Sequence, residues 1–312
     1  MATQTLAEAA KLINNEIAAG VAEDIITTNP VYNVIPWTGY EGQAILVNRE
    51  NALGDAQVLA VGGTITAKAA ATFTQVPFSA TTIIGDAEMN GLVAAQSSGA
   101  GVDQLAIEIS SKAKSVGRLI QTGIATGTGT APQMNSLHSL VDSGQYTTAS
   151  AGQALSLGLL DELLNLVKAK DGEVDWIMMP ARTLRAYKAL VRSLGGVTET
   201  MAFTMPNGTT RNVSVYEGVP IFQNDYLSVT ETANGAALTG GALTSVYAGV
   251  WDDGSNKVGV SLIHPIAIPA GIQVENVGAA EAKDEQIVRI KAYANFASFN
   301  RRGIARLTSI NN

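Results

Sequence analysis

The stretch from Gln43 to Ile84 places the strongest constraint on how this chain can fold. It is rich in Thr, Val, Ala and Gly, shows no helical periodicity, and has strand-forming ends, QAILVNRE and FTQVPFSATTII. Between these ends, Gly54, Gly62 and Gly63 interrupt short extended pieces. We therefore predict a long β-hairpin with too few large apolar side chains to build a core of its own. An isolated two-stranded hairpin is at best marginally stable in water, so this one needs another surface to lie on.

An apolar arm precedes the hairpin. Thr5, with Glu8 three residues later, is expected to cap a short amphipathic helix over residues 5–19. Pro30 and Pro36 then bias the residues before them toward extended backbone, which favours an arm over a packed helix. The arm needs a surface, either the core of its own chain or a neighbouring subunit. As candidates for a subunit interface it contributes Val31, Tyr32, Ile35 and Trp37.

The remaining chain predicts one long helix, an α/β unit and a long strand. In residues 102–122 the apolar positions recur at helical spacing, at Leu105, Ile109, Ala113, Val116 and Ile120. Residues 155–196 predict a helix, the buried strand VDWIMM and a second helix opened by Pro180, since proline is tolerated in the first turn. Near the C-terminus, QIVRIKAYANFASF alternates apolar and polar residues, which is typical of a strand.

Composition narrows the class of protein. Charged residues make up only 15 % of the 312 residues, against roughly 25 % in an ordinary soluble domain, which indicates that much of the surface faces other protein. The chain has no Cys and only two His, which excludes thiolate and His-rich metal sites. A net charge of −7 gives no global basic footprint for reading nucleic acid. Neither a signal peptide nor an apolar run long enough for a membrane span is expected.

The order of these parts resembles the tailed-bacteriophage major capsid protein family, whose fold is shared with encapsulin shells. The sequence EDIITTNPVYNVIPWTGYEGQAILVNRE resembles that family's N-terminal arm leading into its extended loop. Residues 102–122 resemble its spine helix, and LLDELLNLVKAKDGEVDWIMMPARTLRAYKALVRSLGG resembles the start of its axial domain. The phrase VYEGVPIFQNDY matches a recurrent G-x-P-[IVL]-x-x-x-D pattern at Gly218, Pro220, Ile221 and Asp225.

The resemblance implies an α+β chain divided into five parts. These are an N-terminal arm (1–42), an extended β-hairpin loop (43–85), a peripheral domain with the spine helix (86–150), an axial α/β domain (151–270), and return strands of the peripheral domain with the C-terminus (271–312). It also implies pentamers and hexamers of one chain in an icosahedral virion capsid around double-stranded DNA, assembled in the host cytoplasm. Separate scaffolding, portal and decoration proteins are the further partners that the resemblance implies.

Two more sets of side chains are interface candidates. Some relatives link the extended loop covalently to a neighbour through Lys and Asn; Lys68 is the only Lys of the hairpin, but no partner Asn is identifiable and no bond is predicted. Phe73 is a large apolar residue on the same hairpin. The second helix of the α/β unit carries a basic face with Arg182, Arg185 and Lys188, which is either solvated, used in subunit pairing, or in weak contact with a DNA backbone.

No catalytic, cofactor or metal residues are predicted. The Gly/Thr loop GIATGTGT lacks the Lys of a phosphate-binding loop and follows a helix, so a flexible surface or intersubunit loop is the expected role. Asp252, Asp253 and Asn256 depart from calcium-loop spacing and read as a turn. The alternatives to a capsid are an encapsulin-like compartment, a small-molecule enzyme that uses the α/β unit, and an extended tail or fibre protein.

Overall fold

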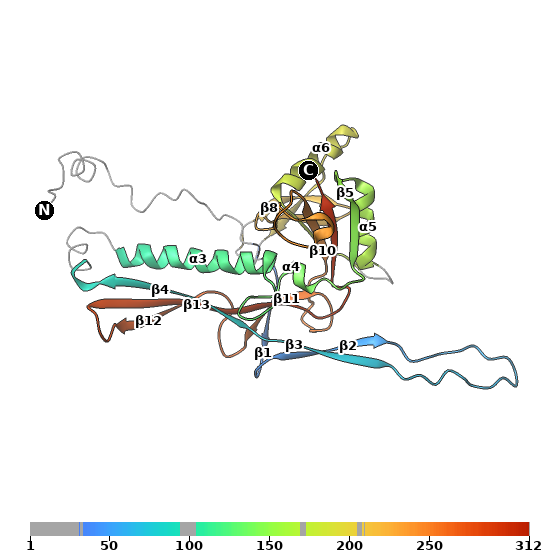
Figure 1. Cartoon of the computed structure of the whole chain (residues 1–312), viewed down its shortest axis with the longest axis horizontal. Helices are drawn as coiled ribbons and strands as arrows, with labels where there is room; N and C mark the ends of the chain where they lie inside the picture. The colour runs from blue at the N-terminus through green and yellow to red at the C-terminus, as the bar shows by residue number, and fades with distance from the viewer. Residues whose placement is uncertain are drawn as a thin grey trace.

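The computed structural model describes residues 31, 34–93, 104–168, 173–204, 208 and 210–311. Within these residues the strands form a five-stranded sheet, a seven-stranded sheet and a separate two-stranded hairpin (Figure 1). The helix expected over 5–19 and the candidate residue Tyr32 lie outside the described residues. No described helix has the length and apolar character needed to cross a membrane.

Strand β13 (Glu285–Ser298) is the centre of the five-stranded sheet. The antiparallel strands β4 (Thr81–Asn90) and β12 (Gln273–Ala279) pair with its first part along opposite edges, and β11 (Val260–Pro265) pairs with its last residues. Strand β1 (Trp37–Tyr40) extends the sheet as the parallel partner of β11. The predicted long strand is therefore confirmed, and every other strand of this sheet is placed through it.

The alternation of β13 explains this central place. Val288, Ile290, Ala292 and Ala294 are buried, and the side chains between them stay partly exposed, as the sequence predicts. The outward charges are paired across the sheet: Arg289 binds Asp86 of β4 through two hydrogen bonds of 2.9 Å, and the Lys291 ammonium lies 2.6 Å from Glu275 of β12. These two ion pairs between neighbouring strands stabilise the register of the sheet while their charged groups stay partly in water.

Helix α3 (Gln104–Thr126) lies along this sheet (Figure 1). Its stripe packs onto β4 and β13 as predicted, with Val116 and Ile120 buried. The helix runs one turn beyond the expected end at residue 122, because Ile124 is also fully buried and continues the stripe. The sheet and helix together form a long, flat layer.

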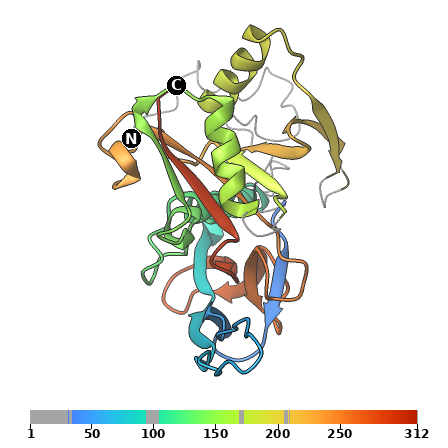
Figure 2. The ribbon, with the colours of Figure 1, turned by 90° about the vertical axis from the view of Figure 1, so that its right-hand side faces the viewer.

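The seven-stranded sheet stands above this layer (Figure 2). Its strands, in spatial order, are β5 (Tyr146–Gln153), β14 (Ile304–Ile310), β10 (Thr244–Gly249), β6 (Trp176–Met179), β9 (Val219–Gln223), β8 (Thr210–Tyr216) and β7 (Thr200–Thr204). Helices α5 (Leu157–Lys168) and α6 (Ala181–Ser193) bury Leu160, Leu163 and Tyr187 against one face of this sheet. Two further short helices are α4 (Leu137–Leu140) and the 3-10 turn η2 (Ala233–Gly235).

The G-x-P-I-x-x-x-D phrase builds the start of α6. Gly218, at φ +82°, turns β8 into β9, a conformation that costs glycine little. The chain then runs through the buried residue Ile221 and reaches Asp225, whose carboxylate accepts a 3.1 Å hydrogen bond from the Ala181 backbone N–H. Pro180 was predicted to be the first residue of α6. It is instead the N-cap, so the helix begins one residue later, at Ala181, and proline has no side-chain hydroxyl to cap it. Asp225 therefore supplies the negative partner that this N-terminus needs.

Four strands do not follow the expected division of the chain. The strand β11, which lies in the expected axial part 151–270, belongs to the five-stranded sheet, and β14, in the expected part 271–312 of return strands and C-terminus, lies inside the seven-stranded sheet. Strands β5 and β4 run across the expected boundaries at residues 150/151 and 85/86. The physical reason is that alternation predicts a strand and its buried face but not the strand with which it pairs.

The hairpin of β2 (Ile45–Ala52) and β3 (Thr72–Phe78) projects away from both sheets (Figure 1). Its pairing ends at Ala52 and Thr72, and residues 53–71 continue as a long tip without strand structure. Only the base is packed, in a small cluster formed by Tyr40, Val47, Phe78, Ile263, Ala297 and Phe299. The predicted hairpin is thus confirmed, including its lack of a core of its own.

A buried ion pair lies inside the seven-stranded sheet. The Arg306 side chain of β14 is 1 % exposed, and its Nη2 lies 3.0 Å from Oε2 of Glu231, which is 2 % exposed. Arg306 Nε also donates to the Ser245 hydroxyl at 3.0 Å. Gly235 is required beside it, because a Cβ there would lie 2.3 Å from Nη2. The guanidinium therefore occupies a closely fitted polar site.

Replacement of this arginine tests how much the fold depends on the pair. We expect Arg306→Met to lower the free energy of unfolding by about 3–5 kcal/mol, because it leaves the Glu231 carboxylate buried without its cation. The double variant Arg306→Met/Glu231→Leu is expected to recover part of that loss, since neither charge remains. Urea unfolding of the unassembled chain measures both. Equal stability of Arg306→Met and the wild type would contradict the prediction.

Candidate functional site

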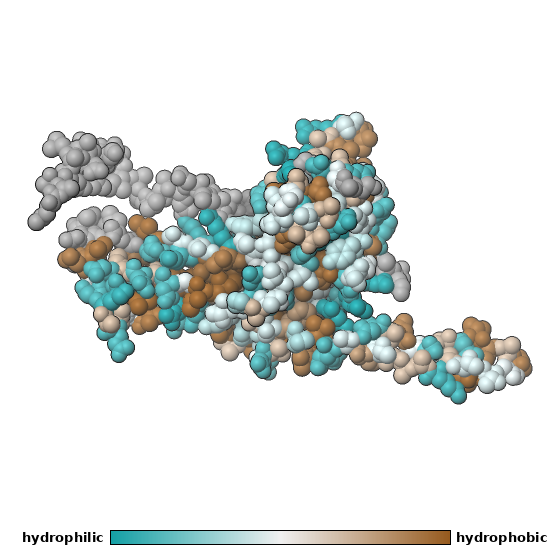
Figure 3. Space-filling view, in the orientation of Figure 1, coloured by the Kyte–Doolittle hydropathy of each residue, from teal (hydrophilic) through white to brown (hydrophobic). Residues whose placement is uncertain are grey.

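The most exposed apolar side chains of the described chain lie on the hairpin. Val58 and Val61, at the tip, are 102 % and 109 % exposed. Further large apolar side chains of the same element are also open to solvent: Leu46, Leu53, Leu59, Ile65 and Phe73. Figure 3 shows this apolar surface at the far end of the projecting arm, separated from the rest of the molecule. Such a concentration of uncovered apolar area marks an interaction surface.

The Gln57 side chain joins the two sides of the tip by hydrogen bonds. The Gln57 carbonyl oxygen accepts hydrogen bonds from the backbone N–H of Thr66 at 2.7 Å and of Ala67 at 2.6 Å, and from the Thr66 hydroxyl at 2.8 Å. The Asp55 N–H donates to the Ala69 carbonyl at 3.1 Å. The tip is thereby closed by hydrogen bonds where strand pairing has ended. A loop ordered before it binds loses less conformational entropy on binding.

The arm residues do not all share the role expected of them. Val31 and Ile35 are only 5 % and 2 % exposed and pack into the core of their own chain, so the own-core alternative holds for these two. Trp37 is half-buried against the same core, with its ring 6.1 Å from that of His264. The reason is that β1 joins the five-stranded sheet beside β11, which carries these side chains into the core. Lys68 and Phe73, in contrast, are exposed on the hairpin.

The three basic candidates on α6 also differ in their surroundings. Arg182 is half-buried, and its Nη2 donates to the Ala242 carbonyl at 3.0 Å, so it holds α6 to a neighbouring loop. Arg185 is exposed and Lys188 is partly exposed, and among the described residues neither forms an ion pair. These two cations are available to a partner outside this chain.

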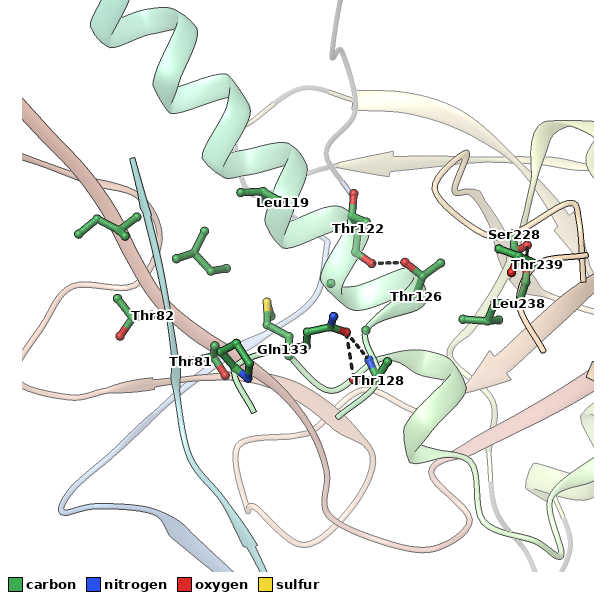
Figure 4. Close-up of a pocket in the computed structure, with 16 residues that line it drawn as sticks. Thr81, Thr82, Leu119, Thr122, Thr126, Thr128, Gln133, Ser228, Leu238 and Thr239 are labelled. Atoms are coloured by element: carbon green, nitrogen blue, oxygen red, sulfur yellow. Dashed lines mark hydrogen bonds between the residues drawn. The ribbon is translucent and has the colours of Figure 1, made fainter. Parts of the chain in front are cut away.

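An open, mainly apolar groove of about 830 Å³ lies where α3 meets β4 (Figure 4). Its walls come from β4, the C-terminal half of α3, the loop 127–134 and a segment that includes Ser228 and Leu238. Ile84 and Leu119 in this groove are 50 % and 54 % exposed. This surface was not predicted from the sequence, although Leu119 gives a signal: it is a large apolar residue next to the buried stripe position Ile120, and so faces outward.

The Gly/Thr loop forms one wall of this groove and is more tightly packed than a flexible loop. A Cβ at Gly127 would lie 2.3 Å from the Met134 carbonyl, and the Gly129 N–H donates to that same carbonyl at 3.0 Å. The Gln133 side chain accepts hydrogen bonds from the N–H and hydroxyl of Thr128. The glycines are therefore needed for close backbone approach, which corrects the expectation of a loop kept mobile by glycine.

The polar groups considered for chemistry lie apart or in turns. Asp252 accepts hydrogen bonds from the Thr38 hydroxyl and the Asn256 N–H, as expected for a turn residue. His138 lies on α4 and His264 on β11, in different parts of the fold. Among the described residues, no group of three or more His, Cys, Asp or Glu side chains is arranged to hold a metal ion.

No protein-family model and no curated protein matches the sequence. Solved structures do match its fold. An encapsulin of Synechococcus elongatus PCC 7942, in its holo complex, has a TM-score of 0.70 at 16 % identity, covering 100 % of this chain and 97 % of that one. The capsid of a native GTA particle has a TM-score of 0.63 at 11 % identity, covering 97 % of both chains. The chain therefore has the fold shared by encapsulin and capsid shells.

A third match comes from a phage. The major capsid proteins of Phage G, in a complex with decoration proteins, have a TM-score of 0.61 at 10 % identity, covering 99 % of this chain and 100 % of that one. The α+β fold class and the resemblance to phage capsid proteins are thereby confirmed for the full length of the chain.

Loss of the Gln57 side chain tests whether the tip is preformed. In Gln57→Ala we expect the Thr66 and Ala67 amide protons to exchange with solvent faster, about tenfold or more, because both lose their acceptor. Hydrogen exchange measured by NMR or mass spectrometry on the unassembled chain reports this. Gln75→Ala, which removes an exposed hydrogen bond to Asn48 in the stem, is the matched control and leaves tip exchange unchanged. Unaltered exchange in Gln57→Ala would show that the tip is ordered by other contacts.

The pH dependence of stability tests the setting of His138. Burial, and then the nearby Arg306 charge, lower the pKa of His138 to about 4. As pH falls below about 6.5, His138 becomes protonated in the unfolded chain but stays neutral in the folded chain. The free energy of unfolding therefore declines between about pH 6.5 and pH 4. In His138→Gln this decline is expected to be smaller. Urea unfolding at pH 7 and pH 4.5 measures it, and an identical decline in both proteins would refute the assignment.

Proposed function

We propose that this chain is a structural shell protein that assembles into pentamers and hexamers of an icosahedral capsid around double-stranded DNA. The observation that carries the proposal is the projecting hairpin, whose apolar tip has no cover from its own chain. The shared fold with capsid shells supports it but is not its basis. The proposed mechanism is binding and geometry, without a catalytic residue or cofactor.

Covering the exposed apolar side chains of the hairpin would stabilise an assembly. Each Å² of apolar surface removed from water contributes about 25 cal/mol, so covering several fully exposed Leu, Val and Phe side chains yields several kcal/mol per hairpin. The hairpin leaves the body on the side away from α3 and the groove beside it (Figure 1). A second copy of the chain can offer such a groove to this tip. Many such contacts, repeated by symmetry, make a closed assembly stable although each contact is modest.

The charged surfaces fit the same proposal. Arg185 and Lys188 of α6 would contribute to pairing of subunits around a capsomer axis or to non-specific contact with packaged DNA. A net charge of −7 suits a container that must release its genome, because strong phosphate binding would oppose release. Scaffolding, portal and decoration proteins are proposed as further partners, and the virion, assembled in the host cytoplasm, as the location.

A protein compartment that encloses cargo is the second candidate. The encapsulin matches with a TM-score of 0.70, above the 0.63 and 0.61 of the two capsids. The two functions differ in their contents. Nuclease-treated particles that retain DNA after purification from a producing culture support the capsid, whereas particles that retain only protein support the compartment.

The size of the purified protein tests the proposal directly. Closed shells tens of nanometres wide are expected in electron micrographs and by sedimentation. A protein that remains a monomer or dimer across salt, pH and concentration would contradict it.

Shortening of the hairpin tests its role in closure. Residues 53–71 can be replaced by Asn-Gly between Ala52 and Thr72, the last paired residues, because this dipeptide forms a tight hairpin turn. We expect folded, soluble capsomers that fail to close into shells. Val58→Asp/Val61→Asp keeps the full length and should also reduce assembly, which separates loss of apolar surface from loss of reach. Shells of normal yield and size from both variants would exclude the hairpin from the interface.

A further inference from the structure

A second, polar cavity of about 470 Å³ lies at the base of the hairpin. One wall is formed by β2 and β3, including Thr74 and Phe78. The other is formed by α4, the Val141–Asp142 segment that follows it, and Arg301 in the turn between β13 and β14. The cavity thus lies between the projecting hairpin and the body of the molecule.

Its charges are unbalanced. Among the described residues that line the cavity, two guanidinium groups, of Arg49 and Arg301, face one carboxylate, that of Asp142. Asp142 is already engaged, because its Oδ2 lies 2.5 Å from Arg301 Nε. The contacts of Arg49 within the described part of the chain are with neutral groups: Nη2 donates to the Ser298 carbonyl, and its guanidinium lies 5.8 Å from the centre of the Phe78 ring. The cavity therefore carries one positive charge more than its own carboxylate neutralises.

It also contains an unused hydrogen-bond donor. The Nε atom of Arg49 is buried and has no hydrogen-bond partner in the described structure. A buried donor without an acceptor is unfavourable, and a charged one more so. Burial, together with the Arg301 charge, lowers the pKa of the Arg49 guanidinium against the opposing effect of Asp142. Both observations point to an anionic acceptor that would complete the site.

We propose that this cavity is a binding site for one oxyanion, a carboxylate or phosphate-like group held between Arg49 and Arg301. Guanidinium groups bind such anions through strong, charge-assisted hydrogen bonds. Since Arg49 belongs to β2 and Arg301 to the body, a bound oxyanion links the hairpin to the body at its base. The link adds a polar fastening to the small apolar cluster that holds the hairpin there.

Inorganic phosphate is the probe that tests the site, on the full-length unassembled chain. We expect saturable binding of one phosphate per chain by calorimetry or NMR titration, at an ionic strength held constant with sodium chloride. Arg49→Gln and Arg301→Gln are each expected to weaken binding by about tenfold or more. Arg192→Gln, which removes an exposed arginine of α6 outside the cavity, is the matched control and should stay within about twofold of the wild type.

Folding of each variant is checked first by its unfolding transition, and Arg49→Lys keeps the charge if Arg49→Gln does not fold. The Lys ammonium keeps the charge but has no planar set of guanidinium donors. The Arg49→Lys variant should therefore still bind phosphate more weakly than the wild type. Absence of saturable phosphate binding, or equal binding by wild type and both cavity variants, would overturn the proposal. These measurements need no shell, so their outcome is independent of the proposed function.

The source of the oxyanion is distinguished in assembled particles. If a carboxylate from a neighbouring copy fills the cavity, assembly removes the phosphate site, and added phosphate slows assembly by competing for it. If a free anion is the ligand, shells bind phosphate as the unassembled chain does. Both outcomes support the oxyanion site and differ only in what occupies it; this last step rests on the proposed function.

Discussion

The fold depends on one continuous stretch of chain, Glu285–Ile310, that passes through both large sheets. As β13 it is the centre of the five-stranded sheet, and as β14 it lies between β5 and β10 in the other. The turn between them is fixed by backbone hydrogen bonds, from Phe299 N–H to the Gly259 carbonyl and from Val250 N–H to the Gly303 carbonyl. Because a short turn joins the two central strands, and Ile304 of β14 packs into the same apolar core as the buried face of β13, the two layers are held together by both the chain and a shared core.

This arrangement explains which parts of the structure the sequence could predict. The β13 alternation and the α3 stripe depend on local periodicity, and both were predicted with their buried faces; the α5–β6–α6 unit was predicted as a helix, a buried strand and a second helix. The membership of β11 and β14 in their sheets was not, because pairing of distant strands leaves no local pattern. Arg306 is an example: a lone arginine between apolar residues in IARLTSI gives no sign that it forms a buried ion pair with Glu231.

The candidate surfaces also differ in whether local sequence could predict them. The hairpin was predictable because a deficit of large apolar residues is visible in sequence, and a segment without a core must find one elsewhere. Burial of Val31 and Ile35 was not, because an apolar arm looks the same whether its own chain or another covers it. The cavity at the hairpin base was equally hidden, since Arg49, Asp142 and Arg301 lie far apart in the chain and meet only where three elements converge.

The two-stranded form of the hairpin has a mechanical consequence. Within the part of the chain that the structure describes, β2 and β3 pair with each other alone, so their ribbon is restrained by one ladder and by the contacts at its base. Two-stranded ribbons twist more strongly than wide sheets do. With one ladder to restrain it, the arm is expected to bend more easily than the two-layered body. In the proposed shell, one sequence would then fit neighbours at slightly different angles while the body keeps its dimensions.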